Sequence, residues 1–168
     1  MLADKEVQIA LQDFAKYVIQ QSRSNLSKGN KNSSMELYNS LGSDVEKTSK
    51  GYSLAFNMAD YGKFQDKGVS GTENKYNTPY KYTNKMPPPS KLDKWIVRKG
   101  IAPRNKGKFQ SRKSLQFAIA RSIYKKGIKP SMFFTKPFVA AFKRLPDDLL
   151  EAYAIGLEKQ IQLNIDKK

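Results

Sequence analysis

The residues best suited to catalysis are carboxylates and lysines near the C-terminal end. Asp147 follows a proline, and Asp166 precedes two lysines. Together these residues are loosely similar to the carboxylates and lysine of a metal-dependent nuclease site. The residues between these two aspartates have the pattern of one helix of about 19 residues, which separates its ends by roughly 28 Å. Because that is too far for two ligands of one metal ion, we interpret Asp147 and Asp148 as charges that stabilise a helix N-terminus.

Histidine and cysteine are absent from the sequence. Their absence removes the commonest general base and the main zinc ligands. The glycines at 68 and 71 are followed by polar residues, not by the Gly-Lys-Ser/Thr of a phosphate-binding loop. We therefore expect no enzyme, no cofactor and no bound metal. A nuclease activity lost in Asp147→Ala would favour the enzyme alternative.

Positive charge is concentrated in one part of the chain. The net charge is +16, and the 53 residues between Asp93 and Asp147 hold 15 Lys and Arg and no acid. Such a segment is either a solvated face or a surface for phosphates, anionic membranes or acidic proteins. The candidate contact residues for nucleic acid or an acidic partner are Arg98, Lys99, Arg104, Lys106, Lys108, Arg112 and Lys113.

Tyrosines alternate with lysines in a long loop predicted over residues 68–90. Tyr76, Tyr80 and Tyr82 have the composition of a surface that stacks on nucleic-acid bases. Tyrosine is also enriched where protein subunits meet, and we favour this second interpretation. Loops of this length are commonly functional or ordered by a partner.

Hydrophobic periodicity predicts an α+β fold, and the length of 168 residues fits a single domain over residues 1–168. A β-hairpin is expected from the alternation at 52–58, with a turn at Lys50-Gly51. A short extra strand is expected within 128–135, and a basic linker over 101–112. About five helices are expected to flank this small antiparallel sheet. Helical patterns occur in six ranges, 1–22, about 34–41, 90–100, 114–126, 137–145 and 147–165, of which 34–41 is the shortest.

Two of the helices carry apolar stripes that we expect to face inward. The stripe of 114–126 consists of Leu115, Ala118, Ile119 and Ile123, and that of the last helix of Leu150, Tyr153, Leu157 and Ile161. No apolar run approaches the ~20 residues that a membrane span needs. We therefore expect no membrane partner.

Three segments together resemble a known family. They are YGKFQDKGVSGT (61–72), KLDKWIVRKGI (91–101) and SLQFAIARSIYKKGIKPSMFFTKPF (114–138). Their order is similar to that of the tail-component or neck proteins of tailed bacteriophages, also described as head-tail joining, tail-completion or tail-terminator proteins. The resemblance covers roughly residues 1–145, in pattern more than identity. The chain departs from the family by one extra residue before Gly68 and by Ser131-Met132 between Pro130 and the phenylalanines.

The resemblance implies a structural protein of the virion. It implies a homo-oligomeric ring at the head-tail connector, between portal or adaptor and tail proteins, around a DNA channel. It also implies assembly in the host cytoplasm. The residues expected at inter-subunit contacts are Tyr61, Phe64, Gly68, Tyr76, Tyr80 and Tyr82. The alternative is a free nucleic-acid-binding module that uses the basic 94–144 segment.

Overall fold

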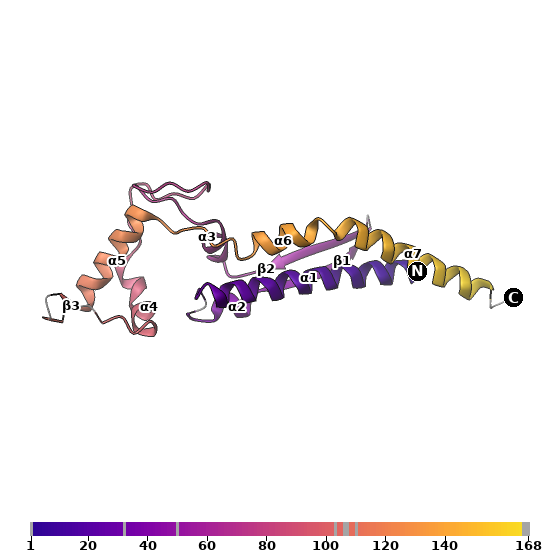
Figure 1. Ribbon diagram of the computed structural model, residues 1–168, viewed down its shortest axis with the longest axis horizontal. Coiled ribbons are helices and arrows are strands. Elements are labelled where there is room, and N and C mark those ends of the chain that lie inside the picture. Colours follow the sequence, from indigo (N-terminus) through magenta and orange to yellow (C-terminus); the bar gives the residue numbers. More distant parts are fainter. Residues whose placement is uncertain are drawn as a thin grey trace. The chain divides into compact units, whose positions relative to one another are not determined.

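The computed structural model describes residues 2–31, 33–49, 51–102, 104–105, 108–109 and 111–165. Its elements are α1 (Leu2–Lys28), α2 (Glu36–Ser40), β1 (Gly42–Thr48), β2 (Gly51–Asn57), α3 (Gly62–Lys67), the 3-10 helix η1 (Pro89–Leu92), α4 (Asp93–Arg98), β3 (Arg104–Asn105), β4 (Lys108–Phe109), α5 (Arg112–Lys126), α6 (Thr135–Phe142) and α7 (Leu145–Ile165). Figure 1 shows helices and short antiparallel strand pairs, so the α+β class expected from the sequence is confirmed.

The chain forms two compact units, each built from separate stretches of sequence. Unit 1 comprises Met1–Leu26, Ser40–Met58 and Phe133–Lys168, and unit 2 comprises Ser27–Asn39 and Ala59–Met132. The loop expected over 68–90 and the basic residues of 101–112 both belong to unit 2. Within 101–112, the backbone of β3 pairs antiparallel with that of β4.

The predicted hairpin lies in unit 1 and is confirmed. Strands β1 and β2 pair from Gly42↔Asn57 to Thr48↔Gly51. Tyr52, Leu54 and Phe56 are partly buried, while the residues between them are exposed. This period of two gives the hairpin one face toward the core and one toward solvent.

Aromatic rings join the hairpin to the helices of unit 1. Phe14 of α1, Phe56 of β2 and Phe138 of α6 meet edge to face, with ring centroids 5.9 to 6.2 Å apart. Such pairs contribute about 0.5–1.5 kcal/mol each beyond the area that they bury. The buried core around them consists of Leu11, Phe14, Val18, Ala141 and Leu145. Figure 1 shows α1 in indigo alongside the hairpin and the orange and yellow helices that complete this core.

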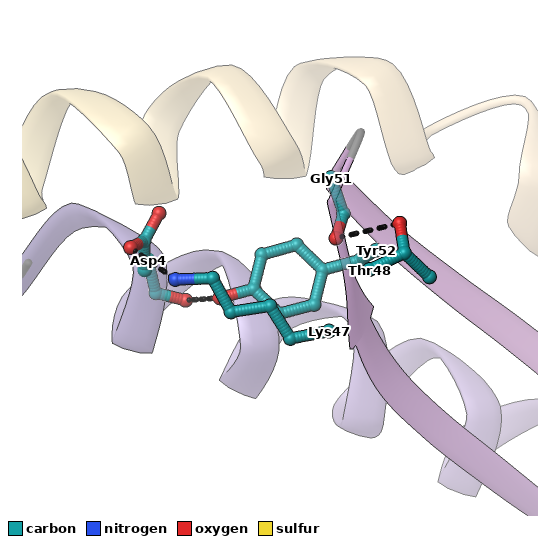
Figure 2. A network of polar contacts seen from close by, with 5 residues as sticks. All are labelled: Asp4, Lys47, Thr48, Gly51 and Tyr52. Atoms are coloured by element: carbon teal, nitrogen blue, oxygen red, sulfur yellow. Dashed lines mark hydrogen bonds and ion pairs between the residues drawn. The ribbon is translucent and has the colours of Figure 1, made fainter.

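A polar network fastens the turn end of the hairpin to the start of α1 (Figure 2). The Lys47 Nζ lies 2.7 Å from the Asp4 Oδ2, and the Tyr52 hydroxyl donates to the Asp4 carbonyl at 2.7 Å. The hydrogen bond from Lys47 lowers the pKa of Asp4, and the same bond raises the pKa of Lys47. Because the ion pair is exposed, solvent and salt screen it.

Unit 2 is organised by a backbone contact between segments that are far apart in sequence. Val69 and Ile128 exchange two hydrogen bonds, of 2.9 and 2.8 Å. Gly127, which ends α5 as expected, leaves no room for a side chain, since a Cβ there would lie 2.2 Å from the Val69 carbonyl oxygen. This contact holds the loop that follows α3 against the end of α5.

The strand expected within 128–135 is not formed there. Only Ile128 makes a β-bridge, to Val69, before the chain turns. Pro130 has no N–H for a ladder, and Met132 has a φ of 52°, which interrupts an extended run. The following residues then begin α6 at Thr135.

Both predicted inward stripes need correction. On α5, Leu115, Ile119 and Ile123 are partly buried, in agreement with the prediction, but Ala118 is exposed and Ala120 is buried instead. On α7, the stripe of Leu150, Tyr153 and Leu157 is exposed, and the side chain of Ile161 lies outside the described residues. The face that α7 buries carries Leu145, Leu149, Ala152 and Gly156. Periodicity cannot choose between the two faces, because the apolar arc of α7 is wider than one packed side of the helix.

Candidate functional site

The charge of the protein belongs almost entirely to unit 2. Its segments carry 20 Lys and Arg against 5 Asp and Glu, a net charge of +15. The segments of unit 1 carry 11 basic and 10 acidic residues. The two units therefore differ strongly in the partners that their surfaces attract.

Helix α5 displays part of this charge on one exposed face. Ser111 caps the helix, because its Oγ accepts a hydrogen bond from the Ser114 N–H at 3.2 Å. Lys113, Phe117 and Arg121 follow at four-residue intervals and are all exposed, with Phe117 at 52%. Four-residue spacing places them in one row along the helix. We call this row the α5 face.

A shallow groove of about 470 Å³ runs along the α5 face. Exposed Ala118 and Ser122 line it together with Phe117 and Arg121. The Lys125 Nζ at its edge pairs with the Glu73 carboxylate at 2.6 Å. An exposed ring beside cations can stack on a nucleobase while the cations meet phosphates, or it can pack against a protein surface.

Of the seven predicted cationic contact residues, four have described side chains, and these four differ in their surroundings. Arg98 and Lys113 are exposed, on α4 and α5. Lys99 is partly buried and donates to the Asn30 side-chain oxygen at 2.9 Å, so it fastens the end of α4 to the segment after α1. The backbones of Arg104 and Lys108 lie in β3 and β4, but their side chains, and all of Lys106, lie outside the described residues.

Arg112 has an internal partner. Its Nη1 lies 3.7 Å from the Asp93 Oδ1, and the same carboxylate oxygen accepts a hydrogen bond from the Gln116 Nε2 at 2.7 Å. Asp93 thus links the first turn of α4 to the first turns of α5. Arg112 orients these helices as well as adding charge to the surface.

Sequence reasoning missed Phe117, Arg121 and Lys125. All three belong to the acid-free segment, and their four-residue spacing from Lys113 can be seen in the sequence. The predicted cationic contact residues all lie in the densest run of charge, 98–113, and none of them lies beyond the first turn of α5. That spacing is the signal that could have found them.

Most of the predicted tyrosine and phenylalanine contacts lie in a second site of unit 2, which we call the aromatic groove. This groove has a volume of about 640 Å³. Its lining residues are Tyr61, Phe64, Gln65, Val69, Pro79, Tyr80, Lys81, Tyr82, Thr83 and Ile128. Four of the six residues predicted at inter-subunit contacts are therefore brought together here.

The loop after α3 builds the wall of the aromatic groove. Ser70 N–H donates to the Tyr80 carbonyl at 2.8 Å, and Tyr82 N–H donates to the Ser70 carbonyl at 2.9 Å. These two bonds hold the tyrosines at alternate positions of an extended strip. Phe64 packs edge to face against Tyr80, with ring centroids 4.7 Å apart. The groove is thus supported by regular backbone bonds over much of the predicted loop.

The polar groups around the groove are few. The Lys63 Nζ lies 5.2 Å from the Phe64 ring centroid, which suits a cation–π contact, and Lys81 is exposed on the groove wall. Burial raises the pKa of Tyr82. This groove therefore favours an apolar ligand surface with acidic groups at its border.

Two of the predicted contact residues act elsewhere. Gly68 is buried, and a Cβ on it would lie 2.6 Å from the Ile128 carbonyl oxygen, so its role is internal packing. Its φ of 75° and ψ of 178° are essentially restricted to glycine. Tyr76 does not line the groove, and its backbone N–H and carbonyl both bond the Ser70 hydroxyl.

The described residues include no group of three or more acidic side chains that could hold a metal ion. Helix α7 continues from Leu145 to Ile165, in agreement with the helix expected after Asp147, whereas Asp166 lies outside the described residues. Among the described residues, no helix has the length and hydropathy to cross a membrane. Comparison with protein-family models, curated proteins and solved structures finds no match.

Proposed function

We propose that this chain is a structural protein of a tailed-phage virion. It forms a homo-oligomeric ring at the head-tail connector or neck, as a tail-completion or head-tail joining component, and it has no catalytic role. Its partners are copies of itself, the portal or adaptor, and tail proteins, with DNA in the lumen. The main support is the separation of charge, with +15 on unit 2 and nearly none on unit 1.

Charge of this kind suits a ring around a genome. Repetition around an axis turns the patch of each subunit into a continuous positive field, which attracts phosphates. It also orients subunits against acidic neighbours. A ring needs two different surfaces on each copy, because its contacts are heterologous. The aromatic groove of unit 2 supplies one such surface.

The packing of unit 2 lends further support. Tyr61, Phe64 and Gly68 come from one segment that resembles the phage family, and Gly127 and Pro130 come from another. The two segments meet where Gly68 packs against the backbone of Ile128 and Pro130. The resemblance thus rests on residues that form one structural element, although about sixty residues separate them.

The test is the state of assembly of the purified protein. We expect native mass measurement and negative-stain electron microscopy to show closed rings of a single stoichiometry. A strictly monomeric protein that does not enter assembled particles would contradict the proposal. Salt should weaken assembly if the basic unit meets acidic neighbours, since counterions screen exposed charges.

One observation favours the alternative, a free nucleic-acid-binding module. Phe117 is half exposed between Lys113 and Arg121, which is the arrangement of a stacking ring flanked by phosphate contacts. This alternative predicts that the monomer binds DNA with a steep salt dependence. Neutralising Lys113 and Arg121 to Gln would then lower the slope of log K against log salt by about 1.4–1.8, since each phosphate contact adds about 0.7–0.9.

A matched control exists within the same acid-free sequence segment. Lys136 and Lys143 belong to that segment but lie in unit 1, and both are exposed. Neutralising them changes net charge equally. Under the alternative, this control leaves the slope nearly unchanged. If both pairs of substitutions lower the slope equally, DNA is attracted by net charge and does not bind at a site on α5.

A further inference from the structure

Helix α7 leaves an apolar row uncovered. Leu150, Tyr153 and Leu157 are 70%, 51% and 41% exposed, and their spacing of three and four residues places them along one side of the helix. A different side of the helix, about 100° away around its axis, is held within unit 1, where Leu145 is buried in the core. The Lys159 Nζ also pairs with the Glu6 carboxylate at 2.7 Å, which joins α7 to α1.

An acidic row lies directly beside this apolar row. Asp147, Glu151 and Glu158 are exposed and recur at intervals of four and seven residues. At 100° per residue they lie within about 40° of one another around the helix and next to Leu150. Among the described residues, no ion pair joins these three carboxylates to a Lys or Arg. The surface of α7 is thus apolar along one line and negative along the next.

A partner for this surface must be apolar with a positive border. The aromatic groove of unit 2 has this character, because its lining is mostly aromatic or aliphatic and includes Lys81. It belongs to the unit with a net charge of +15. Its volume of about 640 Å³ is large enough to take several side chains. The row from Leu150 to Leu157 extends about 10 Å along the helix, a length suited to anchors in a groove.

We propose that Leu150, Tyr153 and Leu157 of one copy dock in the aromatic groove of a second copy. The acidic row then lies against the lysines of that copy. This inference rests on the proposed function, since it assumes that copies of the chain assemble. Each copy offers a groove and a helix row, so the contact is heterologous and continues from copy to copy until a ring closes.

Disulfide trapping tests the contact in the full-length protein. The sequence has no cysteine, so any disulfide must join introduced cysteines. Thr83 on the groove wall and Leu150 on α7 are both exposed, and their replacement should not disturb the fold. Two single-cysteine proteins are mixed. We expect Thr83→Cys mixed with Leu150→Cys to give at least ten times as much mixed disulfide dimer as Thr83→Cys mixed with Ala55→Cys. Ala55 is the matched control, because it is exposed on the solvent face of the hairpin.

A second variant measures assembly directly. Leu150→Glu keeps the groove intact but places a charge in the apolar row, and we expect at least a tenfold weaker assembly, whereas Ala55→Glu leaves assembly unchanged. If wild type forms rings but neither the disulfide nor the Leu150→Glu effect appears, this docking is wrong and the proposed ring stands. If wild type is only monomeric and does not enter assembled particles, the proposed function itself fails. The double variant Thr83→Cys/Leu150→Cys tests contact within one chain. If it forms an intramolecular disulfide at high dilution, the groove binds the helix of its own chain, and this result also overturns the proposal.

Discussion

Replacing Gly127 with alanine should destabilise unit 2 for two separate reasons. The φ of 73° and ψ of −166° at Gly127 lie in a region that is essentially restricted to glycine. A Cβ there would also lie 2.2 Å from the Val69 carbonyl oxygen and 2.5 Å from the Gly71 nitrogen. These neighbours are backbone atoms of a hydrogen-bonded segment, so they cannot move aside as a side chain can.

The expected loss is the sum of the two effects. A backbone conformation of this kind costs about 1–3 kcal/mol, and overpacking costs about another 1–3 kcal/mol. Two controls in the same unit separate these contributions. Gly100 has a φ of 61° and open space around it, so Gly100→Ala carries only a conformational cost. At Gly71 the φ lies outside the positive range, but a Cβ would lie 2.1 Å from the Lys125 carbonyl oxygen, so Gly71→Ala carries the clash.

Urea unfolding measures these differences. Trp95 is the single tryptophan and lies in α4, so its fluorescence reports on unit 2. With a slope of about 2 kcal/mol per molar urea, a loss of about 4 kcal/mol lowers the midpoint by about 2 M. We expect Gly127→Ala to unfold at lower urea than either control. A midpoint equal to that of Gly100→Ala would refute the close contact between residues 69–71 and 127.

Three further predictions concern other parts of the chain. Lys47→Met should destabilise the protein most at pH values above the ordinary Asp4 pKa of 3.8 and below the ordinary Lys47 pKa of 10.5. The difference in melting temperature between variant and wild type should disappear as the pH falls through the lowered Asp4 pKa or rises through the raised Lys47 pKa. Thermal melts at a series of pH values measure it. Phe14→Ala should lower the free energy of unfolding by about 3–5 kcal/mol, while Tyr17→Ala on the exposed side of α1 should lower it by under about 1 kcal/mol. Circular dichroism in urea measures both values, and equal losses would contradict the burial of Phe14 in the core. Ser111→Ala should cost about 0.5–2 kcal/mol through the lost cap of α5, and an unchanged urea midpoint would show that the cap bond does not form.

Local elements could be predicted well from the sequence. The hairpin follows from alternation at Tyr52, Leu54 and Phe56, and its register is set by the turn before Gly51. The end of α5 follows from Gly127. In these cases the determining residues are neighbours in the chain, so local conformational preference and packing agree.

The candidate sites could be predicted only in part. The sequence predicts Tyr61, Phe64, Tyr80 and Tyr82 as contact residues, and in the structure these four line one groove. The four-residue spacing of Lys113, Phe117 and Arg121 is visible in the sequence, but it does not show that the neighbours of α5 leave this side of the helix exposed. The same uncertainty reversed the expected orientation of Leu150, Tyr153 and Leu157 on α7.

The sequence alone determines that the chain has no histidine or cysteine chemistry and that its positive charge is uneven. These are properties of composition and order along the chain. Only the tertiary structure decides that loop residues 68–73 rest on the end of α5, and that nearly all of the net charge belongs to one unit. Those features depend on contacts between distant segments, which arise when backbone groups and apolar side chains leave water together.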